Sequence, residues 1–223
     1  MYNLILKEFL VQKKMLLFGF IYVIFAAYAF QCIVPNGGAV YTLAPFAVVY
    51  ILIYYSCGYD DKNKTYIIFN SLPIKREDIV ISKYLAVFAF ALYGIACSVL
   101  LGSIGFYIGL PNFERLISLE DIAFVITGGA LFASIFYPLY FKFGIIKMKV
   151  ANIILFMAFM FIPSFIGDYV NSHPNSAIAK SIQELILNTP SFVSKALLVI
   201  IVLIIFLISM LISMRIYKSK DFE

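Results

Sequence analysis

Residues 60–83 read DDKNKTYIIFNSLPIKREDIVISK and form the only long polar passage in the first half of the chain. Nine of these 24 residues are charged, whereas the 45 residues from Met15 to Tyr59 carry no charge. A segment that differs so strongly from its flanks lies in a different solvent. We therefore expect an aqueous connection, called here the polar loop (residues 58–83), between two segments that are buried in a membrane.

The composition predicts an all-α integral membrane protein. Hydrophobic residues make up 63% of the chain and charged residues 13%, with a mean hydropathy of +0.98, whereas soluble domains carry about a quarter charged residues. A membrane helix needs about 20 mostly apolar residues. The 223 residues therefore accommodate six spans in a single transmembrane domain, residues 1–223, and leave no room for a soluble catalytic domain.

Apolar runs and turn signals divide the chain into six expected spans, which cover residues 15–34, 40–57, 84–110, 122–141, 150–167 and 196–214. Residues 1–14 are expected to form a short amphipathic helix in the membrane interface, with a frayed anchor as the alternative. The first apolar run also resembles a signal peptide, but its length favours an uncleaved span.

Two loops complete the expected topology. Residues 142–149 form a tight basic turn. Residues 168–195 form an outer loop, in which apolar residues at 178, 182, 185 and 186 have the spacing of an amphipathic helix. This helix is expected to lie over the bundle, and re-entry into the membrane is the alternative.

The positions of the basic residues predict the orientation. If both termini are cytoplasmic, six spans place 14 of the 17 Lys and Arg residues on the cytoplasmic side, including those of the polar loop. Only Arg115, Lys180 and Lys195 then lie outside. This is the positive-inside bias of a multi-pass membrane protein. The net charge of +5 therefore implies no nucleic-acid partner.

The polar loop has helical signals of its own. Thr65 is a fair helix cap, residues 66–72 make about two turns of apolar helix, and Pro73 ends them, because the residue before a proline avoids the helical region. A second helix is expected over residues 75–83, with two carboxylates in its first turn, where the helix dipole favours them. The loop therefore contains a short stiff helix between two spans.

Small residues recur every four positions in the third expected span, at Gly94, Ser98 and Gly102, and again at Gly105 and Gly109. This spacing lets two helices approach closely. We expect this stripe to pack centrally or against a second subunit, and packing within one subunit is the alternative.

Chemistry that other membrane proteins need is missing from the expected spans, which contain no Asp, Glu, Lys, Arg or His. This argues against an ion-driven mechanism and against an intramembrane enzyme. No phosphate-binding GxxxxGK[ST] loop is present, so ATP would be bound by another chain. We expect no catalytic, cofactor or metal site here. His173 is read as a loop residue, and Cys32, Cys57 and Cys97 as small apolar fillers.

The polar loop resembles the loop after the second span of ABC-2 type transporter permeases. The resemblance rests on Asp61–Thr65, on Ser71-Leu72-Pro73-Ile74-Lys75-Arg76 and on Ser82-Lys83-Tyr84. Leu6-Lys7-Glu8-Phe9, the six spans and the length extend it to the whole chain. Tyr59 departs from the pattern, because many relatives have an acidic residue there.

The resemblance implies a complex in the bacterial plasma membrane, in which two such subunits, homo- or heterodimeric, form the pathway above two cytoplasmic ATPase subunits that bind ATP and Mg²⁺. The helix over residues 66–72 would be the coupling helix that sits in a cleft of the ATPase, and residues 142–149 a weaker second contact. The implied ATPase contacts are Asp60, Asp61, Lys62, Lys64, Tyr66, Ile67, Phe69, Asn70, Leu72, Pro73, Lys75, Arg76 and Glu77. The carboxylates of this loop are read as a docking surface rather than an acid/base or metal set.

The substrate expectation also comes from resemblance. The size and the Phe- and Tyr-rich spans are similar to those of permeases that export amphipathic peptides such as phenol-soluble modulins. The 23 Phe and 16 Tyr residues would accept an apolar helix face, or they meet lipid. Export of antimicrobial peptides, drugs or lipids is an alternative. A different class of function is a non-transporting immunity or scaffold protein that binds a toxin or partner.

Overall fold

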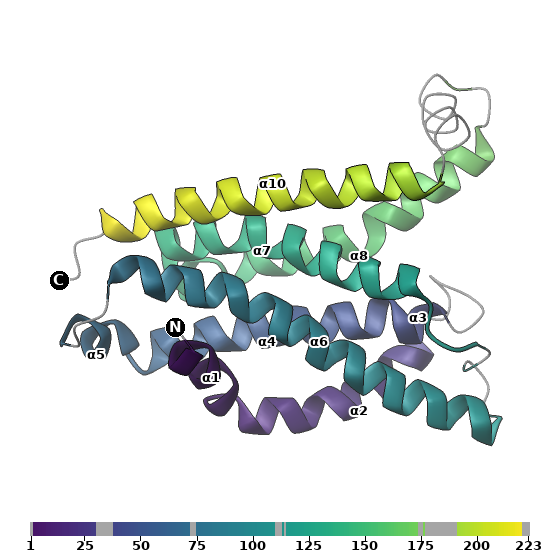
Figure 1. Cartoon of the computed structure of the whole chain (residues 1–223), viewed down its shortest axis with the longest axis horizontal. Coiled ribbons are helices and arrows are strands. Elements are labelled where there is room, and N and C mark those ends of the chain that lie inside the picture. The colour runs from purple at the N-terminus through teal and green to yellow at the C-terminus, as the bar shows by residue number, and fades with distance from the viewer. Residues whose placement is uncertain are drawn as a thin grey trace.

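The computed structural model describes residues 2–29, 38–71, 75–109, 113, 115–173, 176 and 191–219. This part of the chain is helical and contains no strand, and its long helices run along one common axis (Figure 1). The helices are α1 (Tyr2–Leu10), α2 (Lys13–Ala29), α3 (Gly38–Tyr41), α4 (Leu43–Lys62), α5 (Thr65–Ser71), α6 (Arg76–Ile108), α7 (Leu119–Lys147), α8 (Lys149–Ser172) and α10 (Ser191–Lys218).

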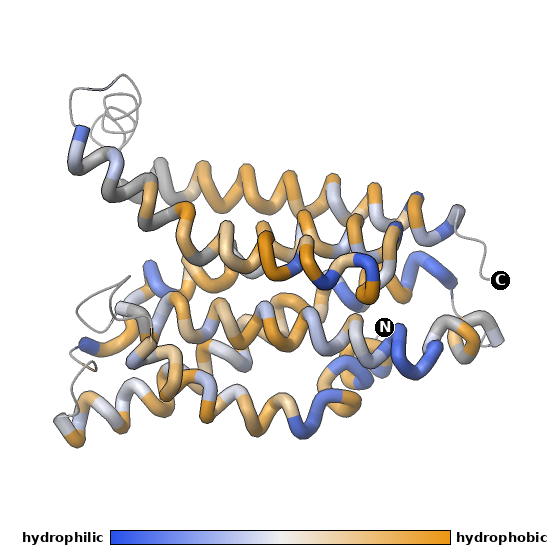
Figure 2. Tube along the Cα trace, turned by 180° about the vertical axis from the view of Figure 1, so that it is seen from behind, coloured by the Kyte–Doolittle hydropathy of each residue, from blue (hydrophilic) through white to orange (hydrophobic). Residues whose placement is uncertain are grey.

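Four of the described helices are long and apolar enough to cross a membrane, namely α4, α6, α7 and the Ala196–Lys218 part of α10. The pair α1 and α2 adds a fifth crossing if it counts as one span bent by 63°. In α8 a shorter apolar stretch covers Lys149–Phe159. Hydrophobic residues cover most of the length of these helices (Figure 2). The all-α membrane fold is thus confirmed, whereas the count of six spans and the orientation remain predictions.

One end of the bundle collects the polar parts of the chain. The helices α1 and α5, the beginning of α6 and the end of α10 all lie there (Figure 1). We call it the polar end. It is the end that the distribution of basic residues predicts to be cytoplasmic.

The helix α6 is longer than expected. We predicted a short helix over residues 75–83 and a separate span over 84–110, but one helix runs without a break from Arg76 to Ile108. Its first turn holds Glu77 and Asp78, as predicted, and it ends at Gly109, whose φ of 74° is left-handed. No Pro or Gly interrupts the chain between the two expected segments. The helix therefore carries the polar loop directly into the bundle.

The helix α7 begins with a capping box. The Ser118 hydroxyl accepts a hydrogen bond from the backbone N–H of Asp121, and the Asp121 carboxylate accepts one from the Ser118 N–H. At the other end, the basic turn expected over residues 142–149 is mostly helical. The helix continues to Lys147 through a kink at Gly144 (φ 75°, ψ 165°), and only Met148 separates it from α8.

The small-residue stripe of α6 is covered from within the chain. A Cβ atom on Gly94 would lie 3.0 Å from the Pro45 carbonyl oxygen, and one on Gly102 would lie 2.4 Å from the Tyr41 hydroxyl. Gly105 faces the Phe113 ring in the same way, while Ser98 is buried and Gly109 caps the helix. These close approaches support the alternative of packing within one subunit. A contact of the stripe with a second subunit stays a prediction.

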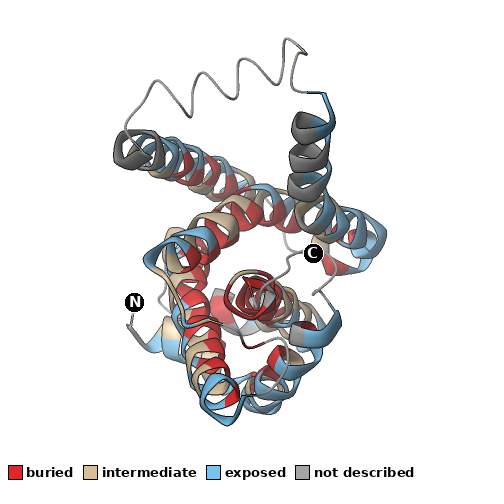
Figure 3. Ribbon diagram, turned by 90° about the vertical axis from the view of Figure 1, so that its right-hand side faces the viewer, coloured by how far each residue is buried: buried red, intermediate tan, exposed pale blue. Residues whose placement is uncertain are grey.

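The core lies where α4, α6 and α7 meet, and their buried faces point toward one another (Figure 3). Aromatic side chains fill much of it, including Tyr84, Phe90, Phe132, Phe136 and Tyr137. The helix α10 is held on this core by polar contacts, since the Tyr84 hydroxyl is hydrogen-bonded to Ser209 and Ser213, each at 2.8 Å. Most Leu and Ile side chains of α10 are exposed, as a lipid-facing helix requires.

Candidate functional site

The helix α5 lies in the polar loop at the polar end of the bundle (Figure 1). It follows Lys64, whose φ of 48° gives the chain a left-handed turn out of α4. Ile67 is 55% exposed, whereas Phe69 is 9% exposed. The helix therefore packs one face on the bundle and presents another outward. The helix expected over residues 66–72 is confirmed, with bounds Thr65–Ser71.

The N-terminal helix α1 contacts both α5 and the end of α4. The Lys7 ammonium group lies 4.8 Å from the centre of the Phe69 ring, within the range of a cation–π interaction. The same group donates a hydrogen bond of 2.8 Å to Asp60 Oδ1. One lysine of α1 thus connects the short helix to the bundle.

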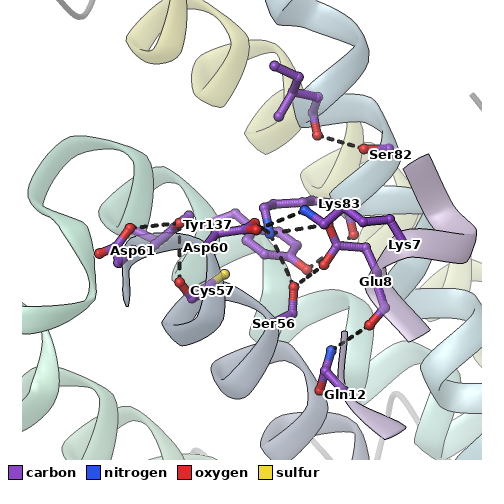
Figure 4. Close-up of polar contacts among 12 residues, drawn as sticks. Lys7, Glu8, Gln12, Ser56, Cys57, Asp60, Asp61, Ser82, Lys83 and Tyr137 are labelled. Atoms are coloured by element: carbon purple, nitrogen blue, oxygen red, sulfur yellow. Dashed lines mark hydrogen bonds and ion pairs between the residues drawn. The ribbon is translucent and has the colours of Figure 1, made fainter. Parts of the chain in front are cut away.

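Beside this contact lies a buried charge cluster, which comprises Lys7, Glu8, Ser56, Asp60 and Lys83 (Figure 4). Its centre is the Lys83 ammonium group, 2.5 Å from Asp60 Oδ2 and 3.5 Å from Glu8 Oε1. Lys83 also donates to the Ser56 hydroxyl at 3.1 Å, and that hydroxyl donates in turn to Glu8. The members come from α1, α4 and α6, so the cluster joins three helices.

The cluster is electrically balanced and shielded from solvent. The side chains of Lys83, Glu8 and Asp60 are 3%, 4% and 10% exposed. With Lys7, two positive groups oppose two carboxylates, which matters because a buried charge is tolerated only when it is paired. Removing one partner of a buried pair costs about 3–5 kcal/mol, since it leaves the other charge uncompensated. The cluster therefore fixes α1, α4 and α6 relative to one another.

Asp61, the neighbour of the cluster, attaches the end of α4 to α7. Its carboxylate accepts a hydrogen bond of 3.1 Å from the Tyr140 hydroxyl and one of 2.8 Å from the backbone N–H of Ile145. That N–H directly follows the kink at Gly144, which turns the backbone toward the carboxylate. Both ends of the polar loop are thus fixed, at Asp61 to α7 and at Lys83 to α4.

The beginning of α6 is also connected to the end of α10. The Arg76 guanidinium donates a hydrogen bond of 3.0 Å to the Lys218 carbonyl oxygen, and the Lys218 ammonium forms an ion pair with Glu77. These groups are at the surface, where solvent screens ion pairs and leaves them little net stabilisation. Their effect is to align two helix ends rather than to hold the bundle.

The predicted ATPase contacts fall into distinct groups in the structure. Asp60, Asp61 and Phe69 point inward and contact other helices. Ile67 and the lysines at 62, 64 and 75 are exposed. Arg76 and Glu77 contact the end of α10. The side chains of Tyr66 and Asn70, and the residues Leu72 and Pro73, lie outside the described part of the chain. The role of the whole set stays a prediction.

Sequence reasoning missed the buried cluster. It placed Lys83 in a solvated loop and saw Glu8 only as part of a resemblance, and it gave Ser56 no role. The available signal was the position of charged residues near the ends of three apolar runs. Lys7 and Glu8 precede the first run, Asp60 follows the second, and Lys83 precedes the third. Their opposite signs allow pairing where those ends meet.

Within the described residues, no group of three or more His, Cys, Asp or Glu side chains is arranged to hold a metal ion. Cys57 and Cys97 are buried free thiols, and Cys32 lies outside the described residues. The described part of the outer loop places the His173 ring against Tyr169, at 4.9 Å between centroids. The amphipathic helix expected near residues 178–186 falls outside that part.

Comparison with known proteins gives a family for nearly the whole chain. The family model described as ABC-2 family transporter protein matches residues 3–218. The comparisons with curated proteins and with solved structures each return no match. The matched range includes the buried charge cluster and all of the described helices apart from Tyr2, the first residue of α1.

Proposed function

Because the chain belongs to the ABC-2 family of transporter proteins, we propose that it is the transmembrane permease subunit of an ATP-driven exporter. It is a multi-pass membrane protein, which in a bacterium lies in the plasma membrane. ATP and Mg²⁺ are bound by two partner ATPase subunits, and this chain forms the pathway with a second copy or a paralogue. The observation that carries the proposal is the attachment of α5 to the bundle.

In this proposal α5 acts as a lever between the ATPase and the membrane helices. Such a lever needs a free surface for the ATPase and a rigid attachment to the bundle. The exposed Ile67 supplies apolar surface on the outward face of α5, and the exposed side chains of Lys62 and Lys64 precede it in the chain. Buried apolar contacts with a polar rim are typical of protein interfaces. We therefore assign these three side chains to the ATPase contact, and Asp60, Asp61 and Phe69 to the base of the lever.

The base distributes a displacement of α5 to several helices. The contact of Phe69 with Lys7 connects the movement of α5 to α1. The hydrogen bond of Asp61 connects it to α7, and the Asp60–Lys83 ion pair connects it to α6. Packed interfaces and ion-paired ends respond as discrete arrangements rather than by continuous bending. Closure of the ATPase under α5 would thus move the membrane helices together.

The cargo that this proposal includes is an amphipathic or hydrophobic peptide. Exposed rings such as Tyr107, Phe124 and Phe165 offer apolar surface wherever they border the space between two subunits. Inside-out vesicles that hold the chain and its ATPase should accumulate a labelled amphipathic helical peptide when ATP is added. A hydrophilic peptide of equal length should remain outside, and equal ATP-independent entry of both peptides would remove this cargo from the proposal.

The test of the permease assignment is loss of the ATPase through a surface change at α5. We expect the chain to co-purify with an ATPase subunit, and Ile67→Glu combined with Lys62→Glu to reduce that recovery and the coupled ATP hydrolysis at least tenfold. The control is Leu119→Glu. Leu119 is as apolar as Ile67, is 84% exposed and lies at the opposite end of the bundle. Unchanged recovery of the ATPase and unchanged ATP hydrolysis in the α5 variant would contradict the proposal. Full peptide export by the chain in cells that lack every ATPase subunit would also contradict it.

A further inference from the structure

A groove of about 460 Å³ lies between α2 and α4, outside the polar loop and its charge cluster. Its walls are almost wholly apolar and include Met15, Phe18 and Phe25 from α2 and Val48, Ile51 and Tyr55 from α4. This volume is in the range of small-ligand sites, about 300–1,000 Å³. The groove is therefore large enough for part of a ligand, and its walls are too apolar for the charged part of one.

The groove opens on the outer surface of the bundle. Phe18, Ile21 and Phe25 border it and are 57%, 63% and 62% exposed. In a multi-pass membrane protein, an apolar groove on the outside of the helices faces the hydrocarbon of the bilayer. An acyl chain is the molecule that this environment supplies.

The length of the groove fits one leaflet. Along α2 it extends from Met15 to Phe25, and ten residues at a rise of 1.5 Å cover about 15 Å of helix. Half of a hydrocarbon core about 30 Å thick is also about 15 Å. An extended chain from a single leaflet would therefore occupy the groove along its whole length.

Two cations mark the end of the groove nearest the polar end of the bundle. Lys13 and Lys14 are exposed and begin α2. At 100° per residue Lys14 shares a face with Phe18, Ile21 and Phe25, and side chains on a helix lean toward its N-terminus. Among the residues that the structure describes, neither lysine forms an ion pair. The Lys14 ammonium group thus remains available to an anion just above the acyl channel, and Lys13 adds a second positive charge on the same turn of the helix.

We propose that the groove is a binding site for an anionic phospholipid, with one acyl chain between α2 and α4 and the headgroup phosphate against Lys14, where Lys13 adds a second positive charge on the same turn. Each lysine near an anionic surface strengthens binding by a factor of about five. A zwitterionic lipid offers the same acyl chain without the net charge, so it binds more weakly. A lipid in this position lies beside the break between α1 and α2, where the two helices are bent by 63°.

The test uses a phosphatidylglycerol probe that carries a photoreactive diazirine on one acyl chain. The purified chain is reconstituted into phosphatidylcholine vesicles that contain a trace of the probe, and the labelled peptides are mapped after irradiation. We expect labelling to concentrate in residues 15–25 and 48–55. Unlabelled phosphatidylglycerol should compete about tenfold better than phosphatidylcholine. Lys13→Gln with Lys14→Gln should reduce labelling of the groove about tenfold or more, and Ile51→Trp should reduce it by filling the space.

Matched controls separate this site from general contact with lipid. Lys147→Gln with Lys149→Gln changes two exposed lysines elsewhere at the polar end, and Leu207→Trp enlarges an exposed side chain of α10. Neither should alter labelling of the groove. If Ile51→Trp does not yield a monodisperse protein, the lysine variant alone decides. Equal labelling by a phosphatidylcholine probe, an unchanged lysine variant, or crosslinks from the groove to a second copy of the chain in place of lipid would each overturn the proposal.

Discussion

The carboxylate of Asp60 lies 2.5 Å from the ammonium group of Lys83, and the whole of α5 lies between these two residues in the sequence. The ion pair therefore closes the polar loop at its base. The two ends of the loop therefore cannot separate without breaking a buried pair. The predictions below follow from this closure and from the contacts around it.

The first prediction concerns Lys83. Lys83→Met keeps much of the apolar stem but leaves Asp60 and Glu8 without their shared cation, so we expect the free energy of unfolding to fall by about 3–5 kcal/mol. Denaturation of the detergent-solubilised protein measures it. Lys149→Met, at an exposed position, should change stability by less than about 0.5 kcal/mol. Similar stability of both variants would show that the cluster does not hold the helices.

The second prediction concerns the attachment of α1. Glu8→Gln keeps the shape of the side chain but removes one of the negative charges that face Lys83, at a cost of about 1.5–3 kcal/mol. Hydrogen–deuterium exchange of the amides in residues 2–10 should become faster, because α1 detaches more often. Glu77→Gln changes an exposed pair and should leave this exchange unaltered. Slow exchange of α1 in the Glu8 variant would mean that apolar packing alone retains the helix.

The third prediction concerns the contact between α4 and α7. Tyr140→Phe deletes the hydroxyl that donates to Asp61, and a hydrogen bond to a charged group contributes about 1.5–3 kcal/mol. We expect the free energy of unfolding to fall by about that amount, and ATP hydrolysis to be less tightly coupled to cargo transport. Tyr107→Phe removes a hydroxyl from an exposed residue and is the comparison in the same unfolding experiment. If the two variants unfold alike, Asp61 is held by the Ile145 N–H without help.

The fourth prediction concerns the glycine stripe. Gly102→Ala would bring a methyl group against the buried Tyr41 ring, with 2.4 Å to its hydroxyl, and overpacking of this kind costs about 1–3 kcal/mol. Gly58→Ala is the opposite case, since within the described part of the chain no atom beyond its sequence neighbours and its own helix backbone lies within 4 Å of the Cβ position. It should raise stability by about 0.5–1 kcal/mol, because alanine is favoured over glycine in a helix. Equal effects in thermal unfolding would show that Tyr41 does not pack on the stripe.

Sequence reasoning succeeded where the signals are local. Pro73 and the polar run predict α5, Glu77 and Asp78 predict the first turn of α6, and the apolar runs predict the long helices. These features depend on neighbours within one or two turns. The same reasoning placed the third span at Tyr84, because it took the last charge, at Lys83, as the membrane boundary.

The buried cluster could not be predicted from the sequence, for a physical reason. Glu8, Asp60 and Lys83 are distant in the sequence and become neighbours only when three helices pack, and their burial depends on mutual neutralisation rather than on any local pattern. The kink at Gly144 is similar, because its left-handed backbone is fixed by the contact of the following N–H with Asp61. The partner of each glycine in the stripe likewise depends on tertiary packing.

The most direct test of the central claim is a crosslink from the outward face of α5. A photoreactive phenylalanine analogue replaces Ile67 in the assembled complex, and the same analogue replaces Leu119 at the opposite end as the control. Irradiation should join position 67 to the ATPase subunit, with a yield that changes when ATP is added, and position 119 should give no such product. Absence of an ATPase crosslink at position 67 in an intact complex, or equal yields at the two positions, would contradict the account.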